Sequence, residues 1–351
     1  MKISILDLKD SSTALFLSKG QKKELQNLLS NEKIKLPISR LSIQTKRLNQ
    51  AYTVMSDDSK LVLEQILKKI KLRAGCSKCI ESTFNIQLTP ELCWLYGFLV
   101  GDGNTINVCR FYNINEKLVE QVNSTVKNHF NVEIKKEPNR SIDYIIPKPV
   151  LIVLESFFGR KGKSVNARVP TLLFSLPNDF VACFVRGLFD TDGTLVCNPE
   201  ITTPNLNLLK DVQLLLKSKF DIYSRIRKAP RKYESHKHIQ HTLTLGMFDR
   251  VKTFANVLKF YEIIGFTHPD KKLKLIMKMK SRTLYAVLQL VKGGFQYSDG
   301  IKEVLHKDWS TVIDHLNKLE KLGLIKKEPE KAYNLIKYKW DTINQDQKRS
   351  I

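Results

Sequence analysis

Apolar residues recur at helical spacing near the start of the chain. The segments KGQKKELQNLLS (19–30) and DDSKLVLEQILKKIKL (57–72) place apolar residues three or four positions apart, which predicts amphipathic helices. We therefore expect residues 1–80 to form a basic, helical N-terminal domain. Residues 72–88 have no sustained period and contain Gly and Ser, which predicts a linker.

Two apolar runs in the middle of the chain share one pattern. LYGFLVGDG (95–103) and VRGLFDTDG (185–193) both end in an aspartate followed by a glycine, and 192 − 102 = 90 residues separate the two aspartates. The same offset relates Cys93 to Cys183, Gly97 to Gly187, Gly103 to Gly193, Leu118 to Leu208 and Phe130 to Phe220. A register held this long indicates an internal duplication.

Each copy reads as helix, strands, helix, strands and helix, with Thr89 and Pro90 as the cap and first residue of the first helix. The predicted fold class is α+β, with tandem αββαββα repeats related by a pseudo-two-fold axis. The expected domains are residues 1–80, repeat 1 at 88–175, repeat 2 at 176–278, and a C-terminal unit at 281–351. That last unit reads as three helices and a basic hairpin, which is the pattern of a winged helix-turn-helix.

Composition narrows the partners. The chain has 58 Lys and Arg against 35 Asp and Glu, a net charge of +23, and a pI of about 9.7. Such a surplus favours a polyanion, above all double-stranded DNA. The sequence has no apolar run of 18 residues and no leader-like N-terminus, so we expect a cytoplasmic, nucleoid-associated protein that is not secreted. Cys76 and Cys79 form a CxxC without a second pair, which argues against zinc.

The two aspartates carry the candidate chemistry. Small residues four apart, Gly97 with Gly101 and Gly187 with Thr191, would let the two helices pack closely, so that their ends meet. Gly103 and Gly193 suit a left-handed residue after each helix. Asp102 and Asp192 would then lie together at negative helix ends, where a hard cation such as Mg²⁺ offsets their repulsion. Paired carboxylates, divalent metal and a basic surface indicate hydrolysis of phosphodiesters.

These motifs resemble the paired signature of LAGLIDADG homing endonucleases, specifically the single-chain, two-motif type called dodecapeptide or DOD. The resemblance runs from Leu88 to Leu275 and includes VRGLFDTDG and FYEIIGFTHPDKKLKL. It implies a monomeric enzyme with a β-saddle on the major groove of DNA and two or more divalent ions. It also implies that Asp102 and Asp192 are the catalytic, metal-binding acids, with Gly101 and Thr191 at the metal.

The resemblance further implies a basic residue near each centre. Lys271 or Lys272 stands where one such lysine is expected, whereas the position of the other is taken by Ala167, with only Arg168 and Lys163 nearby. Either a neighbour substitutes or the cleavage of one strand is weakened.

Basic residues on the predicted strands are the candidates for groove contacts, through phosphates or, for arginine, guanine. They are Arg110, Lys135, Lys136, Arg225, Arg227 and Lys228. In the C-terminal unit the third helix should begin at Trp309 or Ser310 and bury Val312, Leu316 and Leu319. Its candidate DNA contacts are Ser310, Thr311, His315 and Lys318.

Two other functions remain open. The C-terminal unit favours a transcription regulator on the same scaffold that no longer cuts DNA. An intron-splicing maturase would use the same basic saddle on structured RNA. Retention of both acids favours the Mg²⁺-dependent, double-strand DNA endonuclease. The first residue is Met and the chain ends QKRSI, which reads as a free-standing protein rather than an intein.

Overall fold

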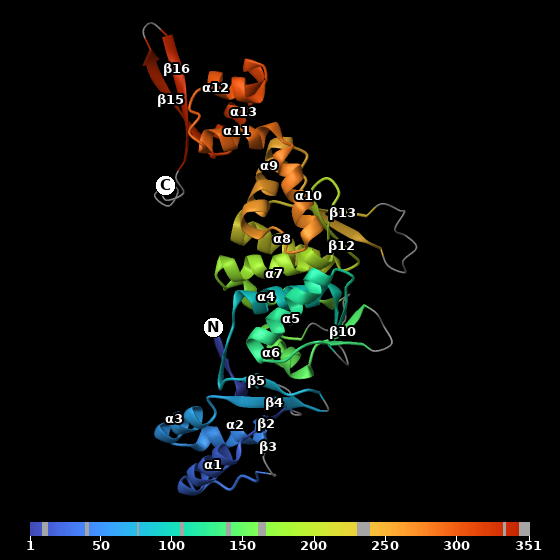
Figure 1. Ribbon diagram of the computed structural model, residues 1–351, viewed down its shortest axis with the longest axis vertical. Coiled ribbons are helices and arrows are strands. Elements are labelled where there is room, and N and C mark those ends of the chain that lie inside the picture. The colour runs from blue at the N-terminus through green and yellow to red at the C-terminus, as the bar shows by residue number, and fades with distance from the viewer. Residues whose placement is uncertain are drawn as a thin grey trace.

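The chain is arranged as four units that follow one another along the long axis of the molecule (Figure 1). The structure, a computed structural model, describes residues 1–8, 13–38, 42–75, 77–105, 109–137, 142–160, 166–229, 239–332 and 335–343. The N-terminal unit lies at one end, the two repeats occupy the middle, and the C-terminal unit lies at the other end.

The N-terminal unit is mixed rather than helical, so the expectation of a purely helical domain was wrong. Its elements are β1 (Lys2–Ser4), η1 (Ile5–Asp7), β2 (Thr13–Phe16), α1 (Lys19–Asn31), β3 (Ser42–Gln44), α2 (Thr45–Val54), α3 (Asp57–Ile66), β4 (Ile70–Ala74), β5 (Ile80–Ser82) and β6 (Asn85–Gln87). Strands β3-β2-β4-β5 form an antiparallel sheet, and β1 pairs with β6.

The error has a local cause. The predicted helices at 19–30 and 57–72 exist as α1 and α3, but α3 ends at Ile66. Leu63, Leu67 and Ile70 are spaced as if the helix continued, and Ile70 is already the first residue of β4. The expected linker at 72–88 was also wrong, because it contains the end of β4 and both β5 and β6.

The two repeats have the same order of elements, which confirms the predicted duplication. Repeat 1 contains α4 (Pro90–Asp102), β7 (Gly103–Asn104), β8 (Arg110–Tyr112), α5 (Glu116–Phe130), β9 (Lys135–Lys136), β10 (Asp143–Ile145) and α6 (Lys148–Phe158). Repeat 2 contains α7 (Asn178–Thr191), β11 (Gly193–Leu195), β12 (Pro199–Thr203), α8 (Leu206–Phe220), β13 (Arg225–Lys228), β14 (His241–Thr244) and α9 (Arg250–Lys259).

The sheets of the repeats have equivalent topologies. Their strand orders are β7-β8-β10-β9 and β11-β12-β14-β13, all antiparallel. The short 3-10 helix η3 (Thr171–Phe174) precedes α7, and a π-helical turn, η5 (Phe260–Ile264), follows α9 and leads to α10 (Pro269–Lys280). In each repeat the motif helix leads directly into an edge strand of its sheet, α4 into β7 and α7 into β11.

Helices α4 and α7 lie side by side at the centre of the molecule (Figure 1). Thr89 caps α4, because its side chain accepts a hydrogen bond from the backbone N–H of Leu92, and Pro90 is the first helical residue, as predicted. All residues from Leu92 to Val100 are buried, so α4 has no solvent-facing side over this stretch. The two motif helices are thus the core of the repeat pair.

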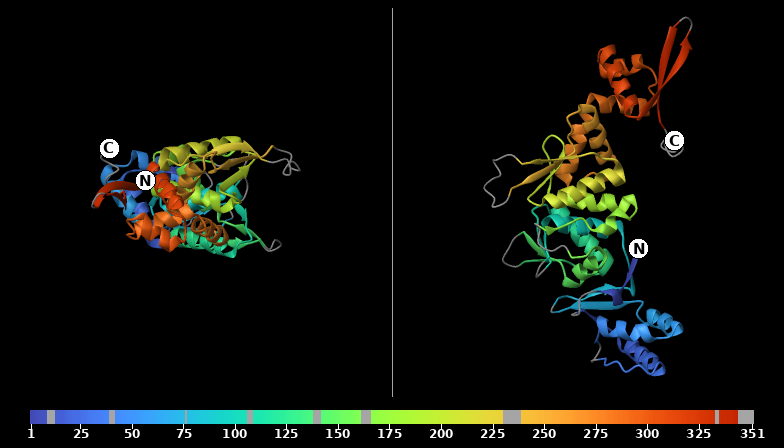
Figure 2. Two further views of the ribbon diagram at one scale, coloured as in Figure 1. Left: turned by 90° about the horizontal axis from the view of Figure 1, so that it is seen from above. Right: turned by 180° about the vertical axis from the view of Figure 1, so that it is seen from behind.

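The C-terminal unit consists of three helices and a β-hairpin, as the pattern predicted. Its elements are α11 (Thr283–Lys292), α12 (Ser298–Leu305), α13 (Trp309–Lys321), β15 (Ile325–Ala332) and β16 (Leu335–Thr342). The hairpin projects on the side of the molecule opposite to the strands of the two repeats (Figure 2). Among the described helices, none combines the length and apolar character that crossing a lipid bilayer requires.

Candidate functional site

The motif helices α4 and α7 touch through their backbones. A β carbon at Gly97 would lie 2.1 Å from the carbonyl oxygen of Phe184, and one at Gly187 would lie 2.2 Å from that of Trp94. A β carbon at Gly101 would lie 1.9 Å from Oγ1 of Thr191. Because any side chain at these glycines would push the helices apart, their small size sets the close approach.

The glycines that follow the two motif helices have a different backbone conformation from the one predicted. Neither Gly103 nor Gly193 has a positive φ, and Gly103 is extended, with φ −80 and ψ 138. A β carbon would lie 2.5 Å from the carbonyl oxygen of Leu99 in the first case and 2.2 Å from that of Phe189 in the second. The expectation of a left-handed cap was wrong: these positions need glycine because the chain turns back against the last helical turn.

Asp102 and Asp192 stand at the equivalent ends of α4 and α7, and both are half-buried. Asn113 donates a hydrogen bond from Nδ2 to Oδ2 of Asp102 at 2.9 Å. A β carbon at Gly101 would lie 3.4 Å from Cγ of Asp192, so the last turn of α4 reaches the second acid. The helix packing therefore brings the two motif ends together.

Lys271, near the start of α10, places its ammonium group at the C-terminal end of α7. Its ammonium group donates to the backbone carbonyls of Phe189 at 3.2 Å, Asp190 at 2.7 Å and Thr191 at 3.0 Å. A cation is favoured at such a helix C-terminus. Burial lowers the pKa of Lys271, while the charges of Asp190, Asp102 and Asp192 oppose that shift.

Lys272, the alternative to Lys271, has an exposed side chain. The lysine that interacts with the charges of the acids is Lys271. Ala167, at the other expected lysine position, is buried, and its carbonyl accepts a hydrogen bond from Asn205 at 2.7 Å. Arg168 is bound to Asp211 of α8 through Nε at 2.5 Å and through a second nitrogen at 2.8 Å. It is therefore held on α8, and Lys163 lies outside the described residues.

Asp190 is a central residue that the sequence reasoning missed. It is 1% exposed, and it accepts hydrogen bonds from Nε1 of Trp94 at 2.9 Å and from the backbone N–H groups of Thr267 at 2.8 Å and His268 at 2.9 Å. Burial raises the pKa of Asp190, and these donors oppose that shift. The carboxylate thereby ties α4, α7 and the start of α10 together.

A signal for Asp190 existed in the internal repeat. Its equivalent at the 90-residue offset is Val100, so the second motif carries an acid where the first is apolar. A buried acid at a core position needs partners. Those partners are a side chain of the other repeat and a loop more than 70 residues later, which no local pattern reveals.

The donor set is compatible with a hard cation. The two carboxylates and the carbonyls of Gly101 and Thr191 supply only oxygen, the ligand type that Mg²⁺ prefers. The Thr191 carbonyl already accepts a hydrogen bond from Lys271. In the described part of the chain, no three His, Cys, Asp or Glu side chains gather as a metal site. The protein would thus offer few ligands, and phosphate and water would complete the coordination.

Strand register divides the candidate basic residues between two faces. In repeat 1 the inner face carries Phe111, which packs edge-on against Phe98 of α4 with ring centroids 5.3 Å apart. Lys135 and Arg110 both lie beside Ile145, one residue out of phase with Phe111, so they share the outer face. Lys136 lies opposite Tyr144, which puts it on the inner face at the sheet edge.

Repeat 2 follows the same rule. Ile226, Leu243 and Ile201 form one inner row, and the last two are fully buried. Arg225 and Arg227 alternate with Ile226 and so occupy the outer face, whereas Lys228 is on the inner-face register. Of the six candidate strand residues, the outer faces therefore contain four: Arg110, Lys135, Arg225 and Arg227.

The third helix of the C-terminal unit begins at Trp309 and buries Val312, Leu316 and Leu319, as predicted. Ser310 is exposed, while Thr311, His315 and Lys318 are partly exposed. Lys318 is hydrogen-bonded to Asp314, whose carboxylate also lies 3.5 Å from Nδ1 of His315. In the β15–β16 hairpin, Lys327 lies 3.8 Å from the ring centroid of Tyr338.

Comparison with known proteins identifies part of this architecture. Residues 179–265 match the family described as LAGLIDADG-like domain. The chain is 32% identical over 204 residues to glutamine–fructose-6-phosphate aminotransferase of Methanocaldococcus jannaschii, covering 55% of this chain and 18% of that protein. It is 29% identical over 210 residues to elongation factor 2 of Methanopyrus kandleri, covering 57% of this chain and 15% of that protein.

The chain thus spans less than a fifth of the length of these two relatives. Among solved structures, it is similar to the crystal structure of I-DmoI in complex with DNA and Ca, with 16% identity and a TM-score of 0.38. That match covers 54% of this chain and 97% of the other. Residues 179–265, within repeat 2, are thus similar to a LAGLIDADG-like domain, and repeat 1 has the same strand order as repeat 2.

Proposed function

We propose that this protein is a site-specific, metal-dependent endonuclease of the homing type that cuts both strands of duplex DNA. One observation carries the proposal: Asp102 and Asp192 end two helices in backbone contact, and the ammonium group of Lys271 is held on the last carbonyls of α7 next to Asp192. Like charges held close together at two helix ends are costly unless they bind something.

In this proposal the carboxylates of Asp102 and Asp192 hold Mg²⁺, with the adjacent carbonyls of Gly101 and Thr191 as further oxygen donors. When bound, the metal lowers the pKa of a water molecule and stabilises the leaving oxygen. Lys271 supplies positive charge beside the scissile phosphate. Its contacts with the α7 carbonyls orient its ammonium group before the substrate arrives, which is the preorganisation that electrostatic catalysis requires.

The outer faces of the two sheets would bind the DNA. Arg110, Lys135, Arg225 and Arg227 share these faces, and a guanidinium can bind a phosphate or donate two hydrogen bonds to guanine in the major groove. The net charge of +23 supports a polyanionic partner. One chain contains both repeats, so we expect it to act as a monomer.

The decisive experiment compares wild type with Asp102→Asn and Asp192→Asn on a library of duplexes with Mg²⁺. We expect both variants to retain binding and to lose cleavage. Asp58→Asn, which changes an exposed acid in the N-terminal unit, is the matched control and should cut like wild type. Cleavage by either active-site variant at the wild-type rate would refute the assignment of the acids.

A second function, DNA binding without cleavage, is favoured by the C-terminal unit. Three helices and a hairpin with Ser310 exposed at the start of α13 form, in our interpretation, a winged helix-turn-helix. Such a unit adds a DNA reader that cleavage does not require. Wild-type protein that binds a specific duplex and leaves both strands intact with Mg²⁺ or Mn²⁺ would establish this regulator instead.

A further inference from the structure

We propose that the β4–β5 hairpin of the N-terminal unit is a third DNA-binding element, which contacts the phosphate backbone of the duplex flanking repeat 1. This inference rests on the proposed binding of duplex DNA by the two repeat sheets. It does not require that the protein cuts. It assigns a role to a unit that lies outside both repeats.

Positive charge is concentrated in this hairpin and in the two residues that precede β4. Residues 68–78 contain five basic residues and no acidic one, and the five are Lys68, Lys69, Lys71, Arg73 and Lys78. In the described part of the chain, none of them forms an ion pair within 4.0 Å, whereas Arg110 and Arg227 of the repeats each pair with a glutamate. Cations without a carboxylate partner are the ones that gain most from phosphate contacts.

The strand pattern explains where these side chains lie. In β4, Ile70, Leu72 and Ala74 are buried in the core, so the alternate residues Lys71 and Arg73 occupy the opposite face. Lys71 is opposite Phe16 of β2 and Glu81 of β5. Helices α1 and α3 of this unit contribute buried leucines to the same core as Ile70 and Leu72.

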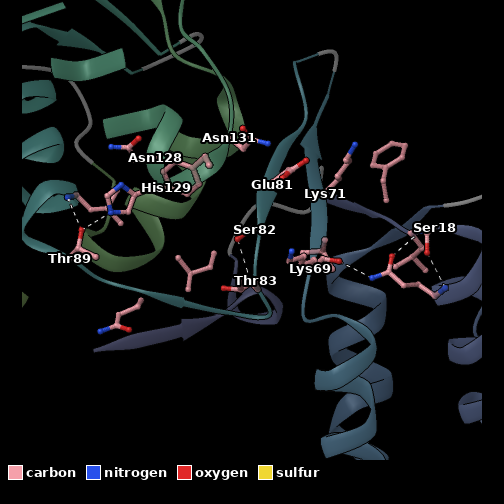
Figure 3. A pocket seen from close by; sticks show the side chains of 18 residues that line it. Ser18, Lys69, Lys71, Glu81, Ser82, Thr83, Thr89, Asn128, His129 and Asn131 are labelled. Atoms are coloured by element: carbon pink, nitrogen blue, oxygen red, sulfur yellow. Dashed lines mark hydrogen bonds between the residues drawn. The ribbon is translucent and has the colours of Figure 1, made fainter. Parts of the chain in front are cut away.

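Repeat 1 covers the basic face only in part, because α6 contacts β4 and α5 contacts β5 while Lys69 and Lys71 remain exposed. A cleft of about 740 Å³ separates the hairpin from the end of α5, and Lys69 and Lys71 line it. Figure 3 shows Lys71 and Glu81 on the hairpin, with Asn128, His129 and Asn131 at the end of α5 across from it. The opposing wall includes the amide groups of Asn128 and Asn131. The cleft thus leaves the lysines accessible to a partner outside the protein.

The hairpin continues the proposed DNA-binding surface of repeat 1. Strand β9 is the outermost strand of the repeat 1 sheet. The hairpin lies close to this edge, because its strand β5 contacts α5, the helix that leads into β9. Strands β4, β10 and β13 extend toward the same side of the molecule in Figure 1 and in the rear view of Figure 2.

A duplex is the partner that fits these observations best. The basic residues follow one strand and its turn instead of converging on one point, which suits a line of phosphates better than a single anion. They also stand beyond the outer end of repeat 1, where a duplex lying along both sheets would continue. The contacts would add affinity without sequence information, since phosphates are common to all sequences.

The test measures how the binding constant for a long duplex depends on salt. The hairpin variant is Lys69→Ala/Lys71→Ala/Lys78→Ala, and the saddle variant is Lys135→Ala/Arg225→Ala/Arg227→Ala. The matched control is Lys19→Ala/Lys23→Ala/Lys35→Ala, which removes three exposed lysines from the helical side of the same unit. Each lost phosphate contact lowers the slope of log K against log salt by about 0.9, so we expect the hairpin variant to lose about 2 to 3.

The outcomes separate the two proposals. A hairpin variant with the slope of the control would overturn this inference, whatever the saddle variant does. A saddle variant with the slope of wild type would contradict the proposed DNA surface of the repeats and leave a positive hairpin result standing. Thermal unfolding of each variant checks that the fold is retained.

A second measurement does not depend on substitutions in the basic residues. Cys79 is an exposed thiol in the same hairpin and can carry a photocrosslinker when Cys76 and Cys197 are replaced by serine. We expect crosslinks between this position and DNA in the complex. A crosslinker at Lys23→Cys should give none, and equal yields at the two positions would contradict a specific contact by the hairpin.

Discussion

Repeats 1 and 2 share one backbone plan but differ in the chemistry of their helix ends. At the same position in the motif, repeat 1 has the buried Val100 and repeat 2 has the buried Asp190. Only the second therefore binds Trp94 of the other repeat and the backbone at the start of α10. The difference at this one position links the start of α10, which carries Lys271, to the second motif helix.

Each sheet carries one ion pair on its outer face, and the acidic and basic positions of this pair are exchanged between the two repeats. In repeat 1, Arg110 of β8 lies 3.5 Å from Glu137, which follows β9. The 90-residue offset maps these residues to Glu200 and Arg227, which lie 3.3 Å apart in repeat 2. Both repeats thus hold an ion pair at the same place, while its arginine sits on different strands of the two sheets. The halves consequently present different donors to a duplex, which favours an asymmetric target.

We expect the largest effect from a change at Lys271, which binds the helix end of repeat 2 and has no assigned counterpart at that of repeat 1. Lys271→Met removes the ammonium group and keeps much of the apolar stem. Loss of one preorganised charge-stabilising group costs on the order of 10² to 10³ in rate. We expect the two strands to be affected unequally, so that nicked duplex accumulates in a time course. Lys272→Met, a change at an exposed neighbour, should behave like wild type, and equal loss on both strands would show that Lys271 serves both centres alike.

A second contrast compares Asp190→Ala with Val100→Ala. The first leaves the buried N–H group of Trp94 and the partly buried backbone N–H groups of Thr267 and His268 without their acceptor, and each unsatisfied buried group costs about 1–3 kcal/mol. We expect a loss of stability of at least about 3 kcal/mol in urea unfolding, from the sum of these unsatisfied groups. Removing two methyl groups at Val100 should cost clearly less, about 1 to 2 kcal/mol. Equal losses would mean that Asp190 stabilises the fold only by filling space and that its hydrogen bonds add no stability.

The helix contact can be tested with Gly97→Ala. The added methyl group would lie 2.1 Å from a backbone oxygen, so the helices must separate, at a cost of about 1–3 kcal/mol or more. Gly20→Ala is the control in α1, because its β carbon would meet only Oγ of Ser18, at 3.9 Å. That change should stabilise the protein by up to about 1 kcal/mol through helix propensity. Thermal unfolding of both variants measures the difference. A Gly97→Ala variant as stable as wild type would show that close packing of α4 and α7 does not depend on this glycine.

The raised pKa of Asp190 predicts a dependence of stability on pH. Below the ordinary carboxyl pKa of 3.8, the group is protonated in the folded and unfolded chain, and it has no effect. As the pH rises from 3.8 through the raised folded pKa, only the unfolded chain releases its proton, so this contribution lowers stability. We expect Asp190→Asn to lose this dependence in unfolding experiments across that window. A folded pKa that lies one pH unit above the unfolded pKa corresponds to about 1.4 kcal/mol.

The smallest effect on stability should come from reversing one surface ion pair. Arg110→Glu/Glu137→Arg gives repeat 1 the charge order of repeat 2. The reversal keeps opposite charges at these half-buried positions, and surface pairs contribute about 0.2–1 kcal/mol, so the free energy of unfolding should barely change. Selection of bound duplexes from a random pool should nevertheless reveal altered base preference in one half-site only. An unchanged preference would mean that these residues contact phosphates or no DNA at all.

Much of the architecture could be predicted because its signals are local or repeated. The helices ending at Asp102 and Asp192, the order of elements in each repeat, and the helix from Trp309 follow from apolar spacing, caps and one 90-residue offset. The short strands of the N-terminal unit could not be predicted in the same way. The alternating apolar residues of β4 directly continue the helical spacing of α3, so no local signal marks where the strand begins. The strands that pair with β4 are β2 and β5, and β2 is distant in the sequence.

The candidate site divides along the same line. The sequence alone determined which residues end the motif helices and that small residues would let those helices approach, because helical periodicity and side-chain size are local properties. Only the tertiary structure decided that Lys271 rather than Lys272 meets the acids, that Arg168 is bound to Asp211, and that Asp190 joins three helices. These contacts join residues far apart in the sequence, and their energies depend on burial and direction, which arise only once the chain has folded.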